Sequence, residues 1–242
     1  PQQEFPTQKD GFKYPVTDEQ PDIGIPALDP NPDNVDIYIG DFKHGRIIRM
    51  KDMAGSGWTA FGSEGTGTGQ FELPEHLAVD ESGRIYVPNA DNGDIVRMDD
   101  MTGKGWVSFA GLGIGNTLRG QQPGPFVVRI RGGKIYAAGW GHIYRFDDMT
   151  GANLVTYGER GDGHGKFNNP QYLSFDAQGR FYIGDNNNHR IVRIDDMAGK
   201  GWTEFGSPGT GVGQFNTTAC VTVDAQGRIY VCDEHNNRIV RI

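Results

Sequence analysis

The chain has 242 residues, enough for one large domain with a proper core, so it needs neither a metal nor a disulfide to fold. Its 23 basic and 31 acidic side chains give a net charge of −8, and the basic residues are scattered singly, which disfavours binding to nucleic acid or to an anionic membrane. Glycine is abundant, at 37 residues, and no apolar run approaches the roughly 20 residues that cross a bilayer, so we expect a turn-rich chain without membrane insertion.

Residues 1–33 are polar and rich in proline, a composition typical of an extended arm rather than of a folded unit. Residues 1–20 could supply a strand that closes the array formed by the rest of the chain, residues 21–242, or could pair with a neighbouring copy. The N-terminal segment is therefore predicted to be either a ring-closing strand or an arm for self-association.

From residue 21 onward the sequence repeats itself. The unit is clearest at 170–206, where PQYLSFD, RFYIG, RIVRI and WTEFG are four strand-length runs separated by short turns. A period in the forties is typical of a propeller or solenoid. Four such strands predict one meandering antiparallel sheet per unit. A tyrosine marks each unit, 46 to 50 residues after the last: Tyr38, Tyr86, Tyr136, Tyr182 and Tyr230.

The first turn of the unit is a three-residue loop that ends on glycine, at 81–83, 177–179 and 225–227. This pattern suits a type I turn whose last residue adopts a left-handed conformation, and it sets the hairpin register. Gly132 and Gly133 form a two-residue turn in the third unit, which is the other favoured hairpin solution.

The third turn of the unit carries a repeated phrase, written DDMAGKG at 195–201. We expect an arginine at the end of the preceding strand and an aspartate three residues later to form a charge-assisted pair in a purely structural turn. The alternative is a repeated Ca²⁺ loop, which is disfavoured because each turn offers at most two carboxylates whereas Ca²⁺ takes about 6–8 oxygen ligands. The pairs are Arg49 and Asp52, Arg97 and Asp100, Arg145 and Asp148, and Arg193 and Asp196.

The segment GHGKFNNPQYLSFDAQGRFYIGDNNNHRIVRI, at 163–194, resembles the blades of the NHL-repeat family of β-propellers. The resemblance extends over residues 21–242 and implies an all-β fold, a β-propeller of four-stranded antiparallel blades. Five repeats are visible, and the ring would be six-bladed if the chain is incomplete. The resemblance is specific for fold and weak for function, because one fold hosts many activities.

The turns between the second and third strands of each unit differ from one another, and variable loops on a rigid scaffold are where binding usually occurs. Three of these turns share an Asp and an Arg five residues apart, which predicts a clamp at the hairpin end: Asp41 and Arg46, Asp185 and Arg190, Asp233 and Arg238. Trp140 is the sharpest ligand candidate, because an aromatic residue in a glycine-flanked turn suits a protein or sugar surface. The full set of ligand-binding candidates is Trp140, His142, His44, Asp91, Asn92, Asn187, His189, Glu234 and His235.

The strongest alternative is a metal-dependent hydrolase or lyase with its site at a central channel. Similar propellers include amidating lyases that hold a metal through histidines near the starts of the inner strands, but the matching positions here carry none: Gly24, Glu75, Phe126, Gln171 and Ala219. Glu75 with Gln171 resembles the carboxylate and amide ligands of gluconolactonase-like propellers, and His76 is adjacent. Glu75, His76 and Gln171 are therefore the channel candidates, for Ca²⁺ or another divalent metal. A metal shared by the turn histidines is disfavoured, because they lie in different units at different offsets.

The two cysteines, Cys220 and Cys232, are expected to face one another across the first hairpin of the last unit. Opposed Cβ atoms on antiparallel strands lie close to disulfide range. Two alternatives stay open, a cross-strand disulfide and a pair of buried thiols, and a disulfide would imply an oxidising compartment. We accordingly expect an extracellular or periplasmic location.

The sequence favours a non-catalytic binding or assembly scaffold that presents the variable turns to a protein or glycan partner, without a cofactor. Self-association through the N-terminal arm or the blade edges is a further expectation. No Ser-His-Asp arrangement, phosphate-binding loop or nucleotide fingerprint occurs, so an enzyme is the less favoured class.

Overall fold

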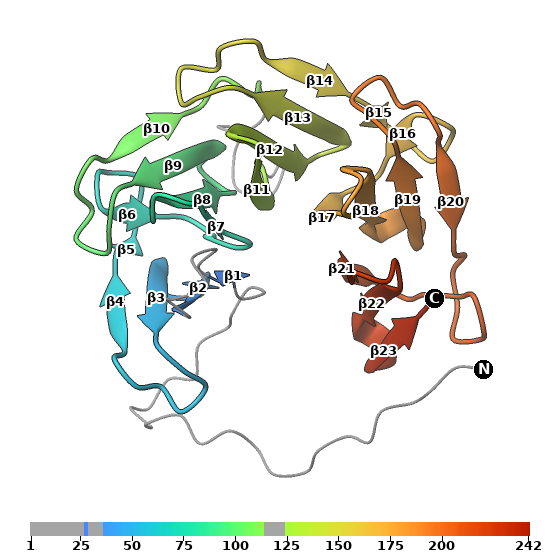
Figure 1. Cartoon of the computed structure of the whole chain (residues 1–242), viewed down its shortest axis with the longest axis horizontal. Helices are drawn as coiled ribbons and strands as arrows, with labels where there is room; N and C mark the ends of the chain where they lie inside the picture. Colours follow the sequence, from blue (N-terminus) through green and yellow to red (C-terminus); the bar gives the residue numbers. More distant parts are fainter. Residues whose placement is uncertain (1–26, 29–35, 114–123) are drawn as a thin grey trace. The chain divides into compact units, whose positions relative to one another are not determined.

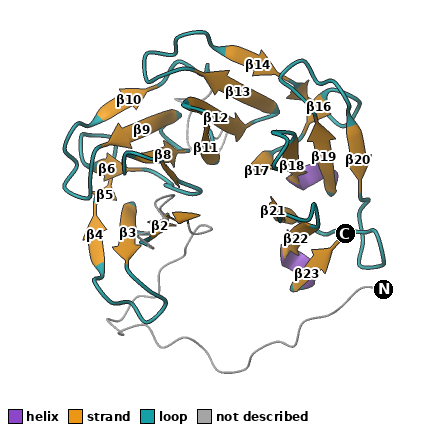
Figure 2. Cartoon of the chain, in the orientation of Figure 1, coloured by secondary structure: helices purple, strands orange, loops and turns teal. Residues whose placement is uncertain are grey.

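The computed structural model of the chain describes residues 27–28, 36–113 and 124–242, and Figure 1 shows its strands in chain order. These residues form short β-strands joined by turns, with two 3-10 turns at Asn186–Asn188 and Glu234–Asn236 (Figure 2). The strands of each main sheet follow the order of the chain, so each sheet is an antiparallel meander. We number these sheets as blades 1 to 5 and name the strands of a blade A, B, C and D in chain order.

Blade 1 contains β1 (Ala27–Leu28), β2 (Ile37–Asp41), β3 (Arg46–Met50) and β4 (Thr59–Phe61). Blade 2 contains β7 (Ala78–Val79), β8 (Ile85–Asn89), β9 (Asp94–Met98) and β10 (Val107–Phe109). Blade 3 contains β11 (Val127–Arg131), β12 (Lys134–Gly139), β13 (His142–Phe146) and β14 (Val155–Tyr157). Blade 4 contains β17 (Pro170–Phe175), β18 (Phe181–Asp185), β19 (Arg190–Ile194) and β20 (Thr203–Phe205). Blade 5 contains β21 (Thr218–Val223), β22 (Ile229–Asp233) and β23 (Arg238–Arg241).

Three glycine-rich segments join one blade to the next, at 63–71, 159–167 and 207–215, and we call them the connecting loops. Each folds back on itself through a parallel pairing of its two ends. The pairings are β5 (Ser63–Glu64) with β6 (Gln70–Phe71), β15 (Glu159–Arg160) with β16 (Lys166–Phe167), and a single bridge between Pro208 and Phe215. The three loops therefore have the same local construction.

The chain divides into two compact units. One contains blades 1 and 2, the other contains blades 4 and 5, and the division falls within blade 3. Each unit has fully buried apolar side chains of its own, such as Val87 and Met98 in the first and Phe167 and Ile183 in the second.

The B strands of blades 1, 2 and 4, which are β2, β8 and β18, are buried along their whole length, because they lie in the interior of the sheet and carry apolar side chains on both faces. The C strands of blades 1 to 4 are mostly buried but have a half-exposed arginine next to their last residue: Ile191 and Val192 of β19 are buried, while Arg193 is half-exposed. Each fully buried Ile or Val contributes about 1.5–3 kcal/mol to stability relative to an exposed one.

The A–B turns of blades 2, 4 and 5 are built around an aspartate that stands three residues before the turn glycine, a role that the sequence pattern did not show. Asp176 Oδ1 accepts the backbone N–H groups of Gln178 and Arg180, both at 3.0 Å. Its Oδ2 accepts Arg180 Nε at 2.6 Å and the hydroxyl of Tyr182 at 3.3 Å. The same cluster recurs as Asp80, Arg84 and Tyr86 in blade 2 and as Asp224, Arg228 and Tyr230 in blade 5. In these three blades the repeated tyrosine is therefore a structural residue.

The glycine predictions for the A–B turns are confirmed. Gly83, Gly179 and Gly227 have φ values of 79°, 85° and 79°, in the left-handed region that a side chain disfavours. Gly132 and Gly133 of blade 3 have φ values of 54° and 69°, as a two-residue type I′ turn requires.

The predicted Arg–Asp pair of the C–D turn is wrong, although the turn is structural as expected. Asp196 Oδ1 accepts the N–H groups of Ala198 and Lys200 within its own turn, at 2.9 and 3.3 Å. Arg193 instead donates to the carbonyl of Gly201 at 3.1 Å, and its nearest carboxylate is Asp195 at 3.7 Å. The aspartate is used up locally, because a turn presents more N–H groups than its own carbonyls can satisfy.

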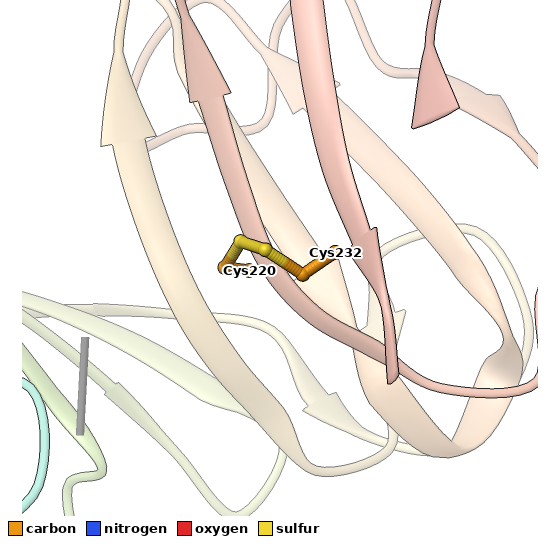
Figure 3. The surroundings of a disulfide bond; sticks show 2 residues. All are labelled: Cys220 and Cys232. Atoms are coloured by element: carbon orange, nitrogen blue, oxygen red, sulfur yellow. A yellow bond between two sulfur atoms is a disulfide. The ribbon is translucent and has the colours of Figure 1, made fainter. Parts of the chain in front are cut away.

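Cys220 and Cys232 are opposite one another on β21 and β22 and form a disulfide with an S–S distance of 2.03 Å (Figure 3). The structure therefore selects the cross-strand disulfide from the two alternatives. It closes the A–B hairpin of blade 5, whose sheet has three strands among the described residues.

The prediction of an all-β β-propeller with four-stranded antiparallel blades is confirmed. Five blade sheets are present among the described residues, and a sixth stays an untested alternative. Residues 1–20, predicted to be an arm or a ring-closing strand, lie outside the described residues, so both of those alternatives stay predictions.

Substituting Asp176 by Ala should lower the free energy of unfolding by about 2–4 kcal/mol, because two N–H groups and a guanidinium lose their acceptor. The matched control Tyr182→Phe removes only one hydroxyl and should cost about 0.5–1.5 kcal/mol. Urea denaturation followed by fluorescence measures both, and equal losses in the two variants would contradict the assignment.

The stability difference between wild type and Asp176→Ala should depend on pH. Burial acts to raise the pKa of Asp176, but the hydrogen bonds and charge of Arg180 outweigh it and hold that pKa below its usual value. The stabilisation is therefore present above about pH 4, the unfolded-state pKa, and is lost as the pH falls through the lower folded-state pKa. The stability difference between wild type and Asp176→Ala should shrink on acidification.

Replacing both cysteines, as in C220A/C232A, should lower the free energy of unfolding by about 2–4 kcal/mol. The reason is that the disulfide, which links residues 12 positions apart, no longer restricts the unfolded chain. Wild-type protein denatured in the presence of a thiol reductant should lose a similar amount. Equal urea midpoints for the oxidised, reduced and substituted proteins would show that the disulfide does not contribute.

Candidate functional site

The B–C turns, at 41–46, 89–94, 139–142, 185–190 and 233–238, were predicted to form the binding side of the chain. In blades 4 and 5 they contact the connecting loop that precedes the blade. Asn188 Nδ2 donates to the carbonyl of Gly161 at 2.8 Å, and Asn236 Nδ2 donates to that of Gly209 at 2.9 Å. We call the B–C turns and the connecting loops together the B–C side.

Arg190 is the centre of the B–C side in blade 4. Its Nε donates to Asp185 Oδ2 at 2.8 Å, its Nη1 to Glu204 Oε2 at 2.7 Å and its Nη2 to the carbonyl of Lys166 at 3.0 Å. The guanidinium also lies 5.7 Å from the centroid of the Trp202 ring. This arrangement satisfies a buried charge through carboxylates, a carbonyl and an aromatic face together.

Arg238 repeats this arrangement in blade 5. Its Nε donates to Asp233 Oδ2 at 2.7 Å, and its two Nη atoms donate to the carbonyls of Thr210, Gly211 and Gln214 at 2.7, 3.1 and 2.7 Å. In blade 1, Arg46 donates to Asp41 at 2.7 Å. The three predicted clamps are therefore confirmed.

The clamp aspartates differ in their surroundings. Burial raises the pKa of Asp185, although hydrogen bonds from Asn188, the Asn168 N–H and Arg190 oppose this effect. Burial acts the same way on Asp233, but hydrogen bonds from the Asn216 N–H, Asn236 and Arg238 outweigh it and lower its pKa.

Two of the predicted ligand-binding histidines have structural contacts within their turns. His44 Nδ1 lies 2.8 Å from Asp41 Oδ1, and His235 Nδ1 lies 2.7 Å from the hydroxyl of Thr217. His189 ends a 3-10 turn with a left-handed φ of 54°. All three residues lie on the B–C side, as expected.

Asn187, Glu234 and His235 are the exposed candidates on the B–C side. The backbone N–H groups of Asn187 and Glu234 donate to the carbonyls of Asn168 and Thr217, at 3.0 and 3.1 Å. Their backbones are therefore held in place while their side chains reach the surface, which suits contact with a partner.

Trp140 has a packing partner that its sequence context did not show. The Arg160 guanidinium lies over its ring, 4.2 Å from the centroid, and Trp140 itself has a left-handed φ of 51°. Both residues are near the connecting loop before blade 4. His142 is half-buried beside Tyr144, with ring centroids 5.9 Å apart, and burial lowers the pKa of His142 so that it is neutral at pH 7.

A polar cleft of about 530 Å³ opens on the B–C side of blade 2. It lies among β6, β8, β9 and β10, which are neighbours in Figure 1. The candidate Asn92 lines it, and Asn92 Nδ2 donates to Asp94 Oδ1 at 3.2 Å. Asp91 adjoins the cleft, with its N–H bonded to the carbonyl of Glu72 at 3.2 Å. The sequence did not single out the other lining residues: Thr66, Gly67, Thr68, Gln70, Asn89, Gly93, Asp94, Trp106, Ser108 and Ala110.

A second cleft, of about 400 Å³, lies beside the A–B turns of blades 2 and 3. Two of its carboxylates already have structural partners: Asp80 pairs with Arg84 at 2.7 Å and Asp147 with Lys134 at 2.8 Å. These groups belong to the turn scaffold, so the cleft is a weaker candidate than the one in blade 2.

The channel candidates Glu75, His76 and Gln171 each contact another described side chain. His76 Nε2 lies 3.8 Å from Glu75 Oε2, and its backbone pairs with Phe126 and Val128. Burial, and then the nearby positive charge of Arg129, lower the pKa of His76 to about 3, so the imidazole is neutral. Gln171 Oε1 accepts a hydrogen bond from Asn186 Nδ2. A positive charge beside His76 disfavours a divalent cation there.

The part of the chain that the structure describes contains no group of three or more His, Cys, Asp or Glu side chains placed to hold a metal ion. No described segment forms a helix that is long and apolar enough to span a membrane.

Two family models match the chain. Residues 167–194 and 215–242 match the NHL repeat, and residues 64–98 match the model described as strictosidine synthase-like, N-terminal. The NHL matches cover the A, B and C strands of blades 4 and 5. No curated protein matches the sequence.

Solved structures of similar fold come from proteins with different activities. A streptogramin B lyase is 17% identical with a TM-score of 0.64, over 96% of this chain and 68% of that one. A chain of a nidogen/laminin complex is 19% identical with a TM-score of 0.69, over 92% and 76%. An auxiliary nutrient binding protein from Bacteroides thetaiotaomicron is 15% identical with a TM-score of 0.57, over 89% and 67%. At these identities the likeness shows the fold alone.

Two of the three clamp arginines, Arg190 and Arg238, should differ in their contribution to stability. Arg190 is 9% exposed, so Arg190→Ala leaves a buried carboxylate without its partner and should cost about 3–5 kcal/mol. Arg238 is 31% exposed, and Arg238→Ala should cost about 1–2 kcal/mol because water can replace part of its contacts. Urea denaturation of both variants measures the difference, and a larger loss for Arg238→Ala would contradict this ranking.

Proposed function

We propose that this chain, an NHL-repeat β-propeller, is a non-catalytic binding scaffold that presents its B–C side to a protein or glycan partner. The observation that carries the proposal is a contrast between the two ends of the blades. The A–B turns repeat one Asp–Arg–Tyr cluster in blades 2, 4 and 5. The B–C turns share a clamp in three blades, differ in their exposed residues and open into a polar cleft in blade 2.

The chemistry of the B–C side suits a polar partner. Asn187 and Glu234 offer amide and carboxylate groups at the surface, and half-buried Trp106 and Trp140 add aromatic rings. Protein and glycan recognition both use this combination, because a tryptophan packs against an apolar face while neighbouring polar groups select the orientation.

The Cys220–Cys232 disulfide supports an extracellular or periplasmic location, since such bonds persist in oxidising compartments. The similar chain in a nidogen/laminin complex and the similar nutrient binding protein are precedents at the level of fold for a propeller that binds. Self-association through residues 1–20 or through the blade edges is part of the same proposal.

The alternative is a metal-dependent hydrolase or lyase that uses Glu75 and Gln171, and one protein of similar fold is a lyase. We rank it second because His76, next to Glu75, is neutral and lies near the positive charge of Arg129. Gln171 is also already bonded to Asn186.

The proposal is tested with glycan and peptide arrays, followed by titration of the best ligand with the double variant N187A/E234A. Each substitution removes one exposed polar group from the B–C side, and the affinity should fall at least about tenfold, which corresponds to about 1.4 kcal/mol. The matched control E81A/Q226A removes one carboxylate and one amide from the exposed A–B turns and should bind within about twofold of wild type.

Two outcomes would overturn the proposal. Equal loss in the control would mean that binding is not on the B–C side. A stoichiometric divalent ion in natively purified protein, measured by plasma mass spectrometry, would place the hydrolase or lyase first.

A further inference from the structure

Blade 2 departs from blades 4 and 5 at one position of the B–C turn. Asp94 stands twelve residues before Trp106, at the place where Arg190 stands twelve residues before Trp202. The acidic clamp partner is changed as well, because Asn89 occupies the position of Asp185. Blade 2 has therefore lost both charges of the clamp and gained a carboxylate in the place of the guanidinium.

The shell that surrounds the guanidinium in the other blades is nevertheless present in blade 2. In blade 4 the Arg190 guanidinium donates to the carbonyls of Gly163 and Lys166, at 3.4 and 3.0 Å. The equivalent positions, four and one residues before the phenylalanine that ends each connecting loop, are Gly67 and Gln70 in blade 2. Gly67 and Gln70 both line the 530 Å³ cleft.

The connecting loops have the same hydrogen bonds in the two blades, so the equivalence is structural. Gln70 N donates to the Gly67 carbonyl at 3.0 Å, as Lys166 N donates to the Gly163 carbonyl at 3.1 Å. Gly65 N donates to the Phe71 carbonyl at 3.2 Å, matching the bond from Gly161 to Phe167 at 3.0 Å.

The aromatic wall of the shell is also in place. Trp106 packs on Phe71 with ring centroids 5.2 Å apart, and Trp202 packs on Phe167 at 5.3 Å. The Arg190 guanidinium lies over Trp202, whereas the Trp106 ring borders the cleft. Carbonyls and the face of a tryptophan form a site suited to a planar cation.

Asp94 supplies the negative charge of this site. It is 5% exposed, and its hydrogen-bond donors among the described residues are the neutral groups of Asn92 and Ser108. No basic residue lines the cleft within the described ranges. A buried carboxylate is stabilised by a cation, and the cleft opens to solvent past the exposed Thr66, Thr68 and Ser108.

From this internal comparison we infer that the blade 2 cleft binds a guanidinium group supplied from outside the chain, the side chain of an arginine on a partner protein. The inference rests on the proposed function and names the chemistry of one contact. A guanidinium fits better than an ammonium because its planar fork donates to the carbonyls and Asp94 while its face stacks on Trp106. A divalent metal fits poorly, since Asp94 is the single carboxylate in the described lining and Ca²⁺ takes about 6–8 oxygen ligands.

The test is calorimetric titration with Nα-acetyl-arginine methylamide, which represents an arginine within a peptide. Its citrulline counterpart has the same shape without the charge and should bind at least about tenfold more weakly. Free arginine separates the two sources of the group: an affinity at least tenfold above that of the peptide form would assign the cleft to a free amino acid and overturn the protein partner.

Two variants locate the binding. Asp94→Asn keeps the shape and removes the charge, and should weaken binding of the arginine probe at least about tenfold. N89D/D94R rebuilds the clamp of blades 4 and 5 inside the cleft, and should abolish binding while the thermal midpoint stays equal or rises. If N89D/D94R does not fold, Asp94→Asn and the citrulline probe still decide the question.

The inference fails if the arginine and citrulline probes bind equally, if neither binds, or if Asp94→Asn binds like wild type. A neutral oligosaccharide that changes Trp106 fluorescence, when the arginine probe does not, would assign the cleft to a sugar. In those cases the scaffold function still stands if N187A/E234A loses its array ligand. If N187A/E234A still binds both the array ligand and the arginine probe, and arginine binding depends on Asp94, the inference about the cleft holds. The wider proposal for the B–C side would then be rejected.

Discussion

A buried aspartate at the end of a hairpin, bonded to backbone N–H groups and to an arginine, is the interaction on which the blades depend. The B strands have only five or six residues, so backbone pairing alone gives little protection against a shift in register. Asp176 at one end of β18 and Asp185 at the other each accept a specific N–H and a specific guanidinium. A one-residue slip would leave two buried carboxylates without partners, and that penalty selects one register.

The two ends of the hairpin use this interaction over different distances. At the A–B turn all partners of Asp176 lie within six residues, so the cluster forms inside one turn. At the B–C side, Arg190 reaches the carbonyls of a connecting loop 24 and 27 residues earlier. The first cluster serves one hairpin, whereas the second joins the hairpin to the segment that leads into its blade.

This difference explains where the chain is free to vary. Substituting an A–B aspartate removes the hydrogen bonds that hold the turn between the first two strands of the blade. Replacing a B–C arginine leaves the A–B end intact. In blade 2, where Asp94 stands in place of the arginine, this opens a space surrounded by carbonyls and an aromatic ring. A binding site therefore needs no new architecture in this fold, because the shell of a structural arginine already suits a positively charged ligand. Solved structures of similar fold come from proteins with different activities, as expected where one fold hosts many functions.

The sequence by itself determined the strands, the turn types, the three Asp–Arg clamps and the register that places Cys220 opposite Cys232. These features depend on residues close together in the chain or on the two-residue period of a strand, and both can be followed in the letters alone. Only the tertiary structure decided that the arginines at the ends of the C strands of blades 2, 3 and 4 donate to turn carbonyls, that Arg160 covers Trp140, and that Asp94 with Trp106 borders a cleft. Arg160 lies 20 residues after Trp140, and the cleft lining extends from Thr66 to Ala110. The geometry of these contacts depends on how the connecting loops fold back, which no local pattern specifies.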